Sequence, residues 1–126
     1  MVEINNPDVL KEVWDFFLRY EAALVGNDVG SLDSMFWDSP HAIRFGAGEN
    51  LYGYAAIKAF RAGRSPQGLA RALQNSVITT FGTDFATTAT EYVRDGQAKV
   101  GRQMQTLVRF PIGWRIVAAH VSLIGG

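Results

Sequence analysis

Apolar and polar residues follow two different periods along the chain, one in each half. In the first part, apolar residues recur every three or four positions from Leu10 to Leu24, which predicts an amphipathic helix over 7–25. Pro7 suits the first turn of such a helix, and Gly26 ends it. Beyond residue 70, runs with a period of two predominate, which is typical of strands.

The remaining expected elements are shorter or extended. In chain order they are a helix over 29–35, a strand over 41–46, a return strand over 51–52, a helix over 55–62, and four strands over 70–81, 85–94, 99–110 and 114–124. Short turns separate these four strands, and Asp95-Gly96 is a strong hairpin signal. Sequential strands joined in this way predict an antiparallel meander.

Helices followed by a meander predict an α+β fold, with the N-terminal helices packed on one face of a curved antiparallel sheet. We expect a single domain over 1–126, with a pocket between the first helix and the concave face. The last strand is apolar on both faces, and no helix is left to cover the outer one. We therefore expect a homodimer that forms through this open sheet face.

Composition restricts the possible functions of the chain more than it restricts its possible folds. The 126 residues carry no net charge, which gives no general attraction to nucleic acid or to an acidic membrane. The absence of cysteine excludes disulfides, thiolate catalysis and cysteine-based zinc sites. Neither a signal peptide nor a membrane span is evident, so we expect a cytoplasmic protein. The two histidines have no acidic residue at ligand spacing, and neither a metal nor a cofactor is predicted.

Arg44 is the most unusual residue of the predicted strand 41–46, which is otherwise largely apolar. A lone buried charge costs several kcal/mol unless something pairs with it. Two interpretations follow. Arg44 forms an internal pair with Glu49 or Glu21, or it binds an anionic ligand through the two parallel hydrogen bonds that a guanidinium offers to a carboxylate.

Tyr20 lies on the apolar face of the first predicted helix, where its hydroxyl needs a partner. By position alone it is more often a satisfied core tyrosine; beside Arg44 it is a candidate acid, base or carbonyl-polarising group. Arg64 is a weaker candidate, as a roof of the pocket. Alternation along the strands gives two further candidates for substrate binding. Arg102 is expected on the same side as Met104, inside the cone, and His120 on the same side as Trp114, on the pocket floor. A structural core histidine is the alternative for His120.

Four stretches together resemble one known family. They are RYEAAL at 19–24, IRFGAGENLYGYAAIKAFRAGR at 43–64, GRQMQTLVRF at 101–110 and GWRIVAAHVS at 113–122. The chain resembles the AtzH-like proteins, which include the HpxZ oxalurate-catabolism group, within the SnoaL-like, NTF2-like (cystatin-like) superfamily. The stretch 43–64 is fairly specific to this family, whereas the last stretch is shared more widely and supports the fold alone.

The resemblance implies an NTF2-like cone, usually a homodimer, that hydrolyses small anionic carboxylated ureides without a metal. The type reaction is the conversion of 1,3-dicarboxyurea to allophanate in s-triazine and cyanuric acid breakdown, and related proteins accompany oxalurate catabolism. The functional tyrosine and arginine of the family fall on Tyr20 and Arg44. The alternatives are a non-catalytic binding or accessory module and, less favoured, a proton-transfer enzyme of the isomerase or cyclase type.

Overall fold

The computed structural model describes residues 1–125, which form three helices and six strands. Their bounds are α1 Pro7–Val25, α2 Val29–Met35, β1 Ile43–Phe45, β2 Asn50–Tyr52, α3 Tyr54–Gly63, β3 Ala72–Phe81, β4 Phe85–Val93, β5 Val100–Phe110 and β6 Gly113–Ile124. In the part of the chain that is described, no helix has the length and apolar character needed to cross a membrane.

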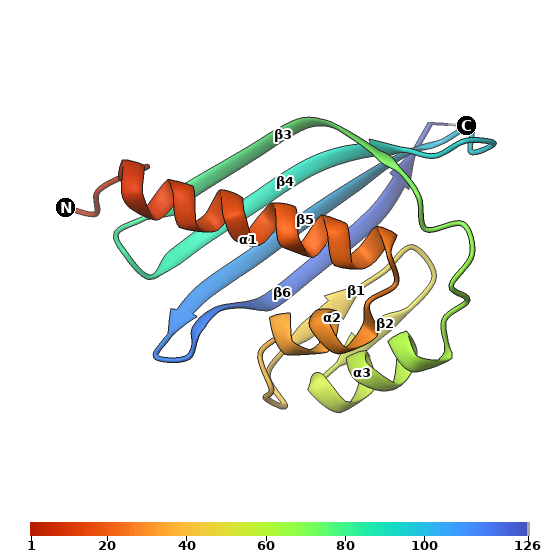
Figure 1. Cartoon of the computed structure of the whole chain (residues 1–126), viewed down its shortest axis with the longest axis horizontal. Coiled ribbons are helices and arrows are strands. Elements are labelled where there is room, and N and C mark those ends of the chain that lie inside the picture. Colours follow the sequence, from red (N-terminus) through yellow and green to blue (C-terminus); the bar gives the residue numbers. More distant parts are fainter. Residues whose placement is uncertain (126) are drawn as a thin grey trace.

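The six strands form one curved, unclosed sheet in the order β2-β1-β6-β5-β4-β3. The predicted meander is confirmed, because β3 to β6 pair antiparallel with their neighbours in sequence. The short strand β1 pairs antiparallel with β2 and parallel with β6, which fixes the first half of the chain to the last strand. Figure 1 shows α1 lying across the long strands, with α2 and α3 beside β1 and β2.

The core lies between α1 and the inner face of the sheet. Asn6 caps α1 by accepting from the backbone N–H groups of Asp8 and Val9, which fixes where the helix begins. One face of α1 is then buried against the sheet, where Leu107 and Ile116 are fully buried. The predicted α+β class, with helices on one face of a curved sheet, is therefore confirmed.

A β-bulge in β6 changes which residues face the core. Ile116 pairs with Leu107, but Ala118 pairs with the next residue of β5, Thr106, so that Val117 has no partner in the ladder. Ile116 points inward before the bulge and Ala119 points inward after it. Any side assigned by counting alternate positions through residue 117 is therefore reversed.

The end of α3 is more buried than its sequence indicates. Arg61 lies in the last turn of α3, where a cation is ordinarily solvated, but its side chain is only 4% exposed. It donates to Asp33 of α2 at 2.6 Å, and its guanidinium lies over the Phe36 ring, 4.9 Å from the centroid. Tyr54 also binds α2, by donating its hydroxyl to the Asp33 carbonyl oxygen at 2.9 Å. These contacts hold α2 and α3 together.

Candidate active site

Arg44 enters the site from β1 with one of its two expected partners. Its Nη1 donates to Glu49 Oε1 at 2.8 Å, so the internal pair is formed with Glu49 and not with Glu21. Its guanidinium also lies over the Phe60 ring of α3, 5.4 Å from the centroid. The Arg44 side chain is 14% exposed, and a cavity lies beside the pair. Arg44 can therefore form the ion pair with Glu49 and still face a ligand in the cavity.

The turn between β1 and β2 is shaped to bring Glu49 back over Arg44. The Gly46 N–H donates to the Glu49 carbonyl oxygen at 2.8 Å, which closes the turn. A Cβ added at Gly46 would overlap with the Glu49 carboxylate. The absence of a side chain at residue 46 is therefore what admits the carboxylate to this position.

The cavity has a volume of about 210 Å³ and opens among the N-terminal helix, the β1–β2 turn and one end of the sheet. Its polar wall comes from side chains of several separate segments. These residues are Tyr20 of α1, Arg44 of β1, Glu49 of the turn, Arg64 after α3, Arg71 before β3, Tyr92 and Arg94 at the end of β4, and Gln103 of β5. The fold thus brings Tyr20, Arg44 and Arg64 to one cavity, and the buried ring of Tyr20 packs against Phe36 with 6.5 Å between centroids.

Arg64 has no partner for part of its guanidinium. Within residues 1–125, its Nε and Nη2 atoms are buried and make no hydrogen bond. Burial is the main cause that lowers the pKa of Arg64, and the nearby cations of Arg61, Arg44 and Arg94 lower it further. Tyr20 lies close enough to raise the pKa of Arg64 in part. The geometry leaves a cationic donor group that a ligand anion would satisfy.

Arg71 and Arg94 were not identified from the sequence. Arg71 holds Glu21 through two nitrogens, the shorter contact being 2.7 Å, and also donates to Gln103. Both guanidiniums lie over the Tyr92 ring, at 4.4 Å for Arg71 and 4.8 Å for Arg94.

The ladder explains how these two arginines meet. Ala72 pairs with Val93, so Arg71 and Arg94 follow at adjacent ends of β3 and β4. The register counted from the β3–β4 turn could have indicated that the two arginines are neighbours. The irregularity between Gln74 and Val77 shifts that register by one residue. The Tyr92 ring itself lies on the bare backbone of Gly101, where an added Cβ would overlap with it.

Arg102 and His120 do not face this cavity, and their expected orientation is wrong. Both lie on the outer face of the sheet, where they line a separate groove of about 380 Å³ with Met104. On β5 the inward residues are the neighbouring glutamines, because Gln103 is buried whereas Arg102 is exposed. On β6 the bulge reverses the parity that related His120 to Trp114, so His120 is neither on the pocket floor nor in the core.

A comparison with models of protein families identifies the family of the chain. The model of the AtzH-like family matches residues 2–126. The chain belongs to the AtzH-like family. A comparison with curated proteins gave no match.

Solved structures extend this assignment. A protein of unknown function of the DUF3225 family from Pectobacterium atrosepticum is 57% identical, with a TM-score of 0.95 over 97% of this chain and 95% of that one. A cystatin-like fold protein from Burkholderia xenovorans is 46% identical, with a TM-score of 0.96 over 100% and 99%. An NTF2-like superfamily protein from Salmonella enterica, at 22% identity and a TM-score of 0.75 over 94% and 93%, shares the fold.

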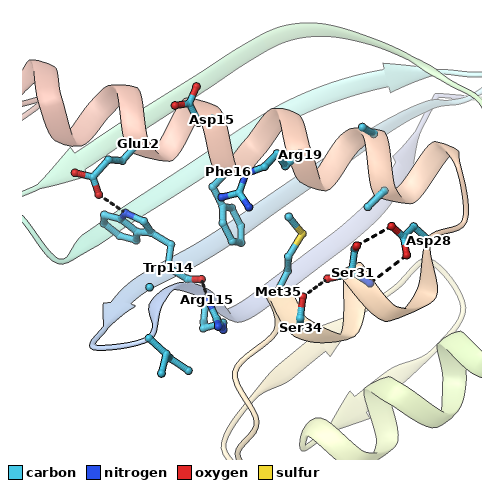
Figure 2. Close-up of a pocket in the computed structure, with 14 residues that line it drawn as sticks. Glu12, Asp15, Phe16, Arg19, Asp28, Ser31, Ser34, Met35, Trp114 and Arg115 are labelled. Atoms are coloured by element: carbon cyan, nitrogen blue, oxygen red, sulfur yellow. Dashed lines mark hydrogen bonds between the residues drawn. The ribbon is translucent and has the colours of Figure 1, made fainter.

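This AtzH-like protein also has a larger and more open hollow, of about 750 Å³, on the other side of α1 (Figure 2). Its polar groups largely bind one another. Glu12 accepts from the Trp114 indole N–H at 3.0 Å, and Asp28 accepts from the Ser31 hydroxyl at 2.6 Å, as Figure 2 shows. Size alone would favour this hollow, but the buried unpartnered donors identified above lie in the smaller cavity.

Among residues 1–125, no group of three or more histidines or carboxylates is placed to hold a metal ion. The cavity gathers cations, two phenols and a carboxylate, a set that suits a small anionic ligand and proton transfer.

Proposed function

We propose that this AtzH-like protein is a small amidohydrolase that acts on carboxylated ureas, in the manner of 1,3-dicarboxyurea hydrolysis to allophanate. The observation that carries the proposal is the cavity shared by Tyr20, Arg44 and Arg64, in which buried guanidinium nitrogens have no partner within residues 1–125. A dicarboxylated urea is short, planar and doubly anionic, and it offers carboxylates at both ends to such donors.

The charge of the cavity fits a dianion. The cations of Arg44 and Arg71 are compensated by Glu49 and Glu21. Arg64 has two buried nitrogens and Arg94 has one buried nitrogen without a partner in the described chain. A ligand with two carboxylates would satisfy donors that the protein leaves open, and hydrogen bonds to charged groups are worth about 1.5–3 kcal/mol each.

In this proposal Arg44 anchors one end of the substrate or polarises its urea carbonyl, and Tyr20 donates a proton to the nitrogen that leaves. A phenol beside guanidiniums is also a suitable hydrogen-bond donor to a developing oxyanion. Arg64 binds the distal carboxylate. Water adds to a terminal carboxyl carbon, the C–N bond breaks, and a shorter urea and bicarbonate are released.

The test is hydrolysis of freshly prepared 1,3-dicarboxyurea, followed by the formation of allophanate. Tyr20→Phe should lower kcat by about 10²–10⁴-fold, because general acid catalysis typically contributes a factor of that order. Arg44→Lys should raise KM, since an ammonium lacks the bidentate fork. Tyr52→Phe is the matched control, as Tyr52 is 65% exposed and lies outside the cavity.

Two results would contradict parts of this proposal, the first the role of Tyr20 and the second the enzymatic activity itself. Full turnover in Tyr20→Phe would remove the phenol from the chemistry. No turnover by the wild type on any N-carboxy or oxamic ureide, with thermal stabilisation by small dicarboxylates retained, would instead identify a non-catalytic binding or accessory module.

We also propose that a second copy of the chain covers the outer face of the sheet. Val77 and Met104 are 59% and 56% exposed there, and the groove lined by Arg102 and His120 lies on the same face. An exposed apolar face of this kind favours association, and a chain without net charge has little electrostatic repulsion to prevent it.

A further inference from the structure

The proposed hydrolysis needs a group that takes a proton from water, and Tyr20, Arg44 and Arg64 do not supply one. Guanidinium groups are protonated at neutral pH and have no acceptor. A phenol ordinarily ionises only near pH 10, so it suits the role of proton donor. A carboxylate is the remaining type of side chain in this cavity that can act as a base.

Glu49 is the one carboxylic residue among the described residues that line the cavity. Glu21 approaches the site only through its pair with Arg71 and is not part of the cavity wall. The Glu49 side chain is 26% exposed, so water reaches it, whereas the Arg44 side chain beside it is only 14% exposed. Its location therefore combines access to water with closeness to Arg44.

The carboxylate of Glu49 is held in place at both oxygens. Oε1 accepts from Arg44 Nη1 at 2.8 Å, and Oε2 accepts from the Gly48 N–H at 3.2 Å. The bare backbone of Gly46 lies directly beneath it. Two carboxylate oxygens offer about four lone-pair positions, so acceptor capacity remains for a water molecule. A positioned base of this kind is what general-base catalysis requires.

We propose that Glu49 is the general base of this site. A water molecule attacks the terminal carboxyl carbon of R–NH–COO⁻ while Glu49 takes one of its protons, and a C–O bond forms. The C–N bond then breaks, its electron pair stays on nitrogen, and nitrogen receives a proton from the Tyr20 hydroxyl. The products are R–NH₂ and bicarbonate. The proton on Glu49 returns through solvent to the Tyr20 oxygen, so that no other reactant is needed. This role rests on the proposed function.

The simpler role for Glu49 is to hold Arg44 in place, and the test must separate the two. Glu49→Gln keeps an oxygen that can accept from Arg44 but cannot take a proton. We expect kcat on 1,3-dicarboxyurea to fall by about 10²–10⁴-fold, the range typical of a lost general base. KM should change less than threefold, and malonate should stabilise the variant against heat at least as strongly as it stabilises the wild type.

A second variant gives a signature that a positioning role would not produce. Glu49→Ala leaves a space beside Arg44, and added formate should restore at least tenfold of the lost kcat by acting as the base. Asp84→Asn is the matched control, because Asp84 is 54% exposed and pairs with Arg109 outside the cavity. Its kcat should stay within twofold of the wild type.

The outcomes are distinguishable. Wild-type turnover that persists in Glu49→Gln overturns the base and leaves the proposed function standing. Loss of both malonate binding and kcat in Glu49→Gln also overturns the role of Glu49 as a base, and identifies it as a positioning residue. No turnover by the wild type overturns the proposed function and this inference with it.

Discussion

The arginines of the cavity differ, residue by residue, in how their charge is compensated. Arg44 and Arg71 each have a carboxylate of the same chain. Arg64 and Arg94 keep buried nitrogens without a partner in the described residues. An unpaired buried donor costs about 1–3 kcal/mol, more when charged, so the ligand-free site is held at the expense of stability.

Replacing Arg64 with methionine should therefore separate stability from binding. The free energy of unfolding should stay equal or rise by about 1 kcal/mol, because an apolar chain of similar length removes a poorly compensated cation. The gain in melting temperature that malonate gives the wild type should be lost. Thermal unfolding with and without malonate measures both effects.

Arg19→Met is the control for this variant, since Arg19 is exposed on α1 outside the small cavity. It should keep the malonate effect. A destabilised Arg64→Met that still responds to malonate would contradict the assignment of Arg64 to the anion site.

Single residues also mark the limit of prediction from the sequence. Arg44 could be singled out because a charge on an apolar strand is unusual, and Tyr20 because of the family resemblance, and the two do share a cavity. Arg71 and Arg94 each stand at a strand end, where arginine is ordinary. Their significance arises only when the strands pair and both meet Tyr92.

At the scale of elements, hydrophobic periodicity was sufficient to predict the helices, the strands and the order of the meander. It was not sufficient for the faces of the sheet. The bulge at Val117 inserts one residue into β6, and nothing in the local composition marks it. His120 was misplaced for that reason. Arg102 was misplaced because β5 buries polar glutamines, which bind Arg71 and Thr88, in place of apolar side chains.

The contact between α2 and α3 gives a pH-dependent prediction. Burial, followed by the charges of Asp33 and Asp38, raises the pKa of Tyr54. A raised pKa means that the fold favours the neutral phenol. Its contribution to stability is therefore complete below the ordinary value of about 10 and is lost as the pH rises above it.

Tyr54→Phe should remove the hydrogen bond to the Asp33 carbonyl oxygen and lower the free energy of unfolding by about 1 kcal/mol at neutral pH. Between about pH 9 and 11 the variant should lose less stability than the wild type. Urea unfolding across this range checks the result. Tyr52→Phe, at an exposed tyrosine, should change neither quantity, and an identical alkaline loss in Tyr54→Phe would refute the assignment.

At the scale of the whole molecule, the two faces of the sheet differ. Its inner face and the helices enclose the cavity, while its outer face is free of helices in the described chain (Figure 1). The α+β class and the family could be predicted because both depend on the pattern of the entire chain. The association state is a separate matter, decided by the outer face alone.

Met104→Lys places a charge at the centre of that outer face, between Ala89 and His120 of the neighbouring strands. If a second copy packs there, sedimentation should show a dimer for the wild type and at least a tenfold weaker association for the variant, since burying an unpaired ammonium costs more than 1.4 kcal/mol. Leu18→Lys, at an equally exposed leucine of α1, should remain dimeric. A wild-type monomer at micromolar concentration would exclude this interface.

The bare backbone of Gly101 beneath Tyr92 has a consequence for the range of ligands. Tyr92 lines the cavity, and its ring can lie as low as it does only because no Cβ stands below it. A side chain at position 101 would displace the Tyr92 ring toward the cavity and reduce the space for a ligand. Relatives that carry alanine or serine there would select smaller acids, through a residue that never meets the substrate.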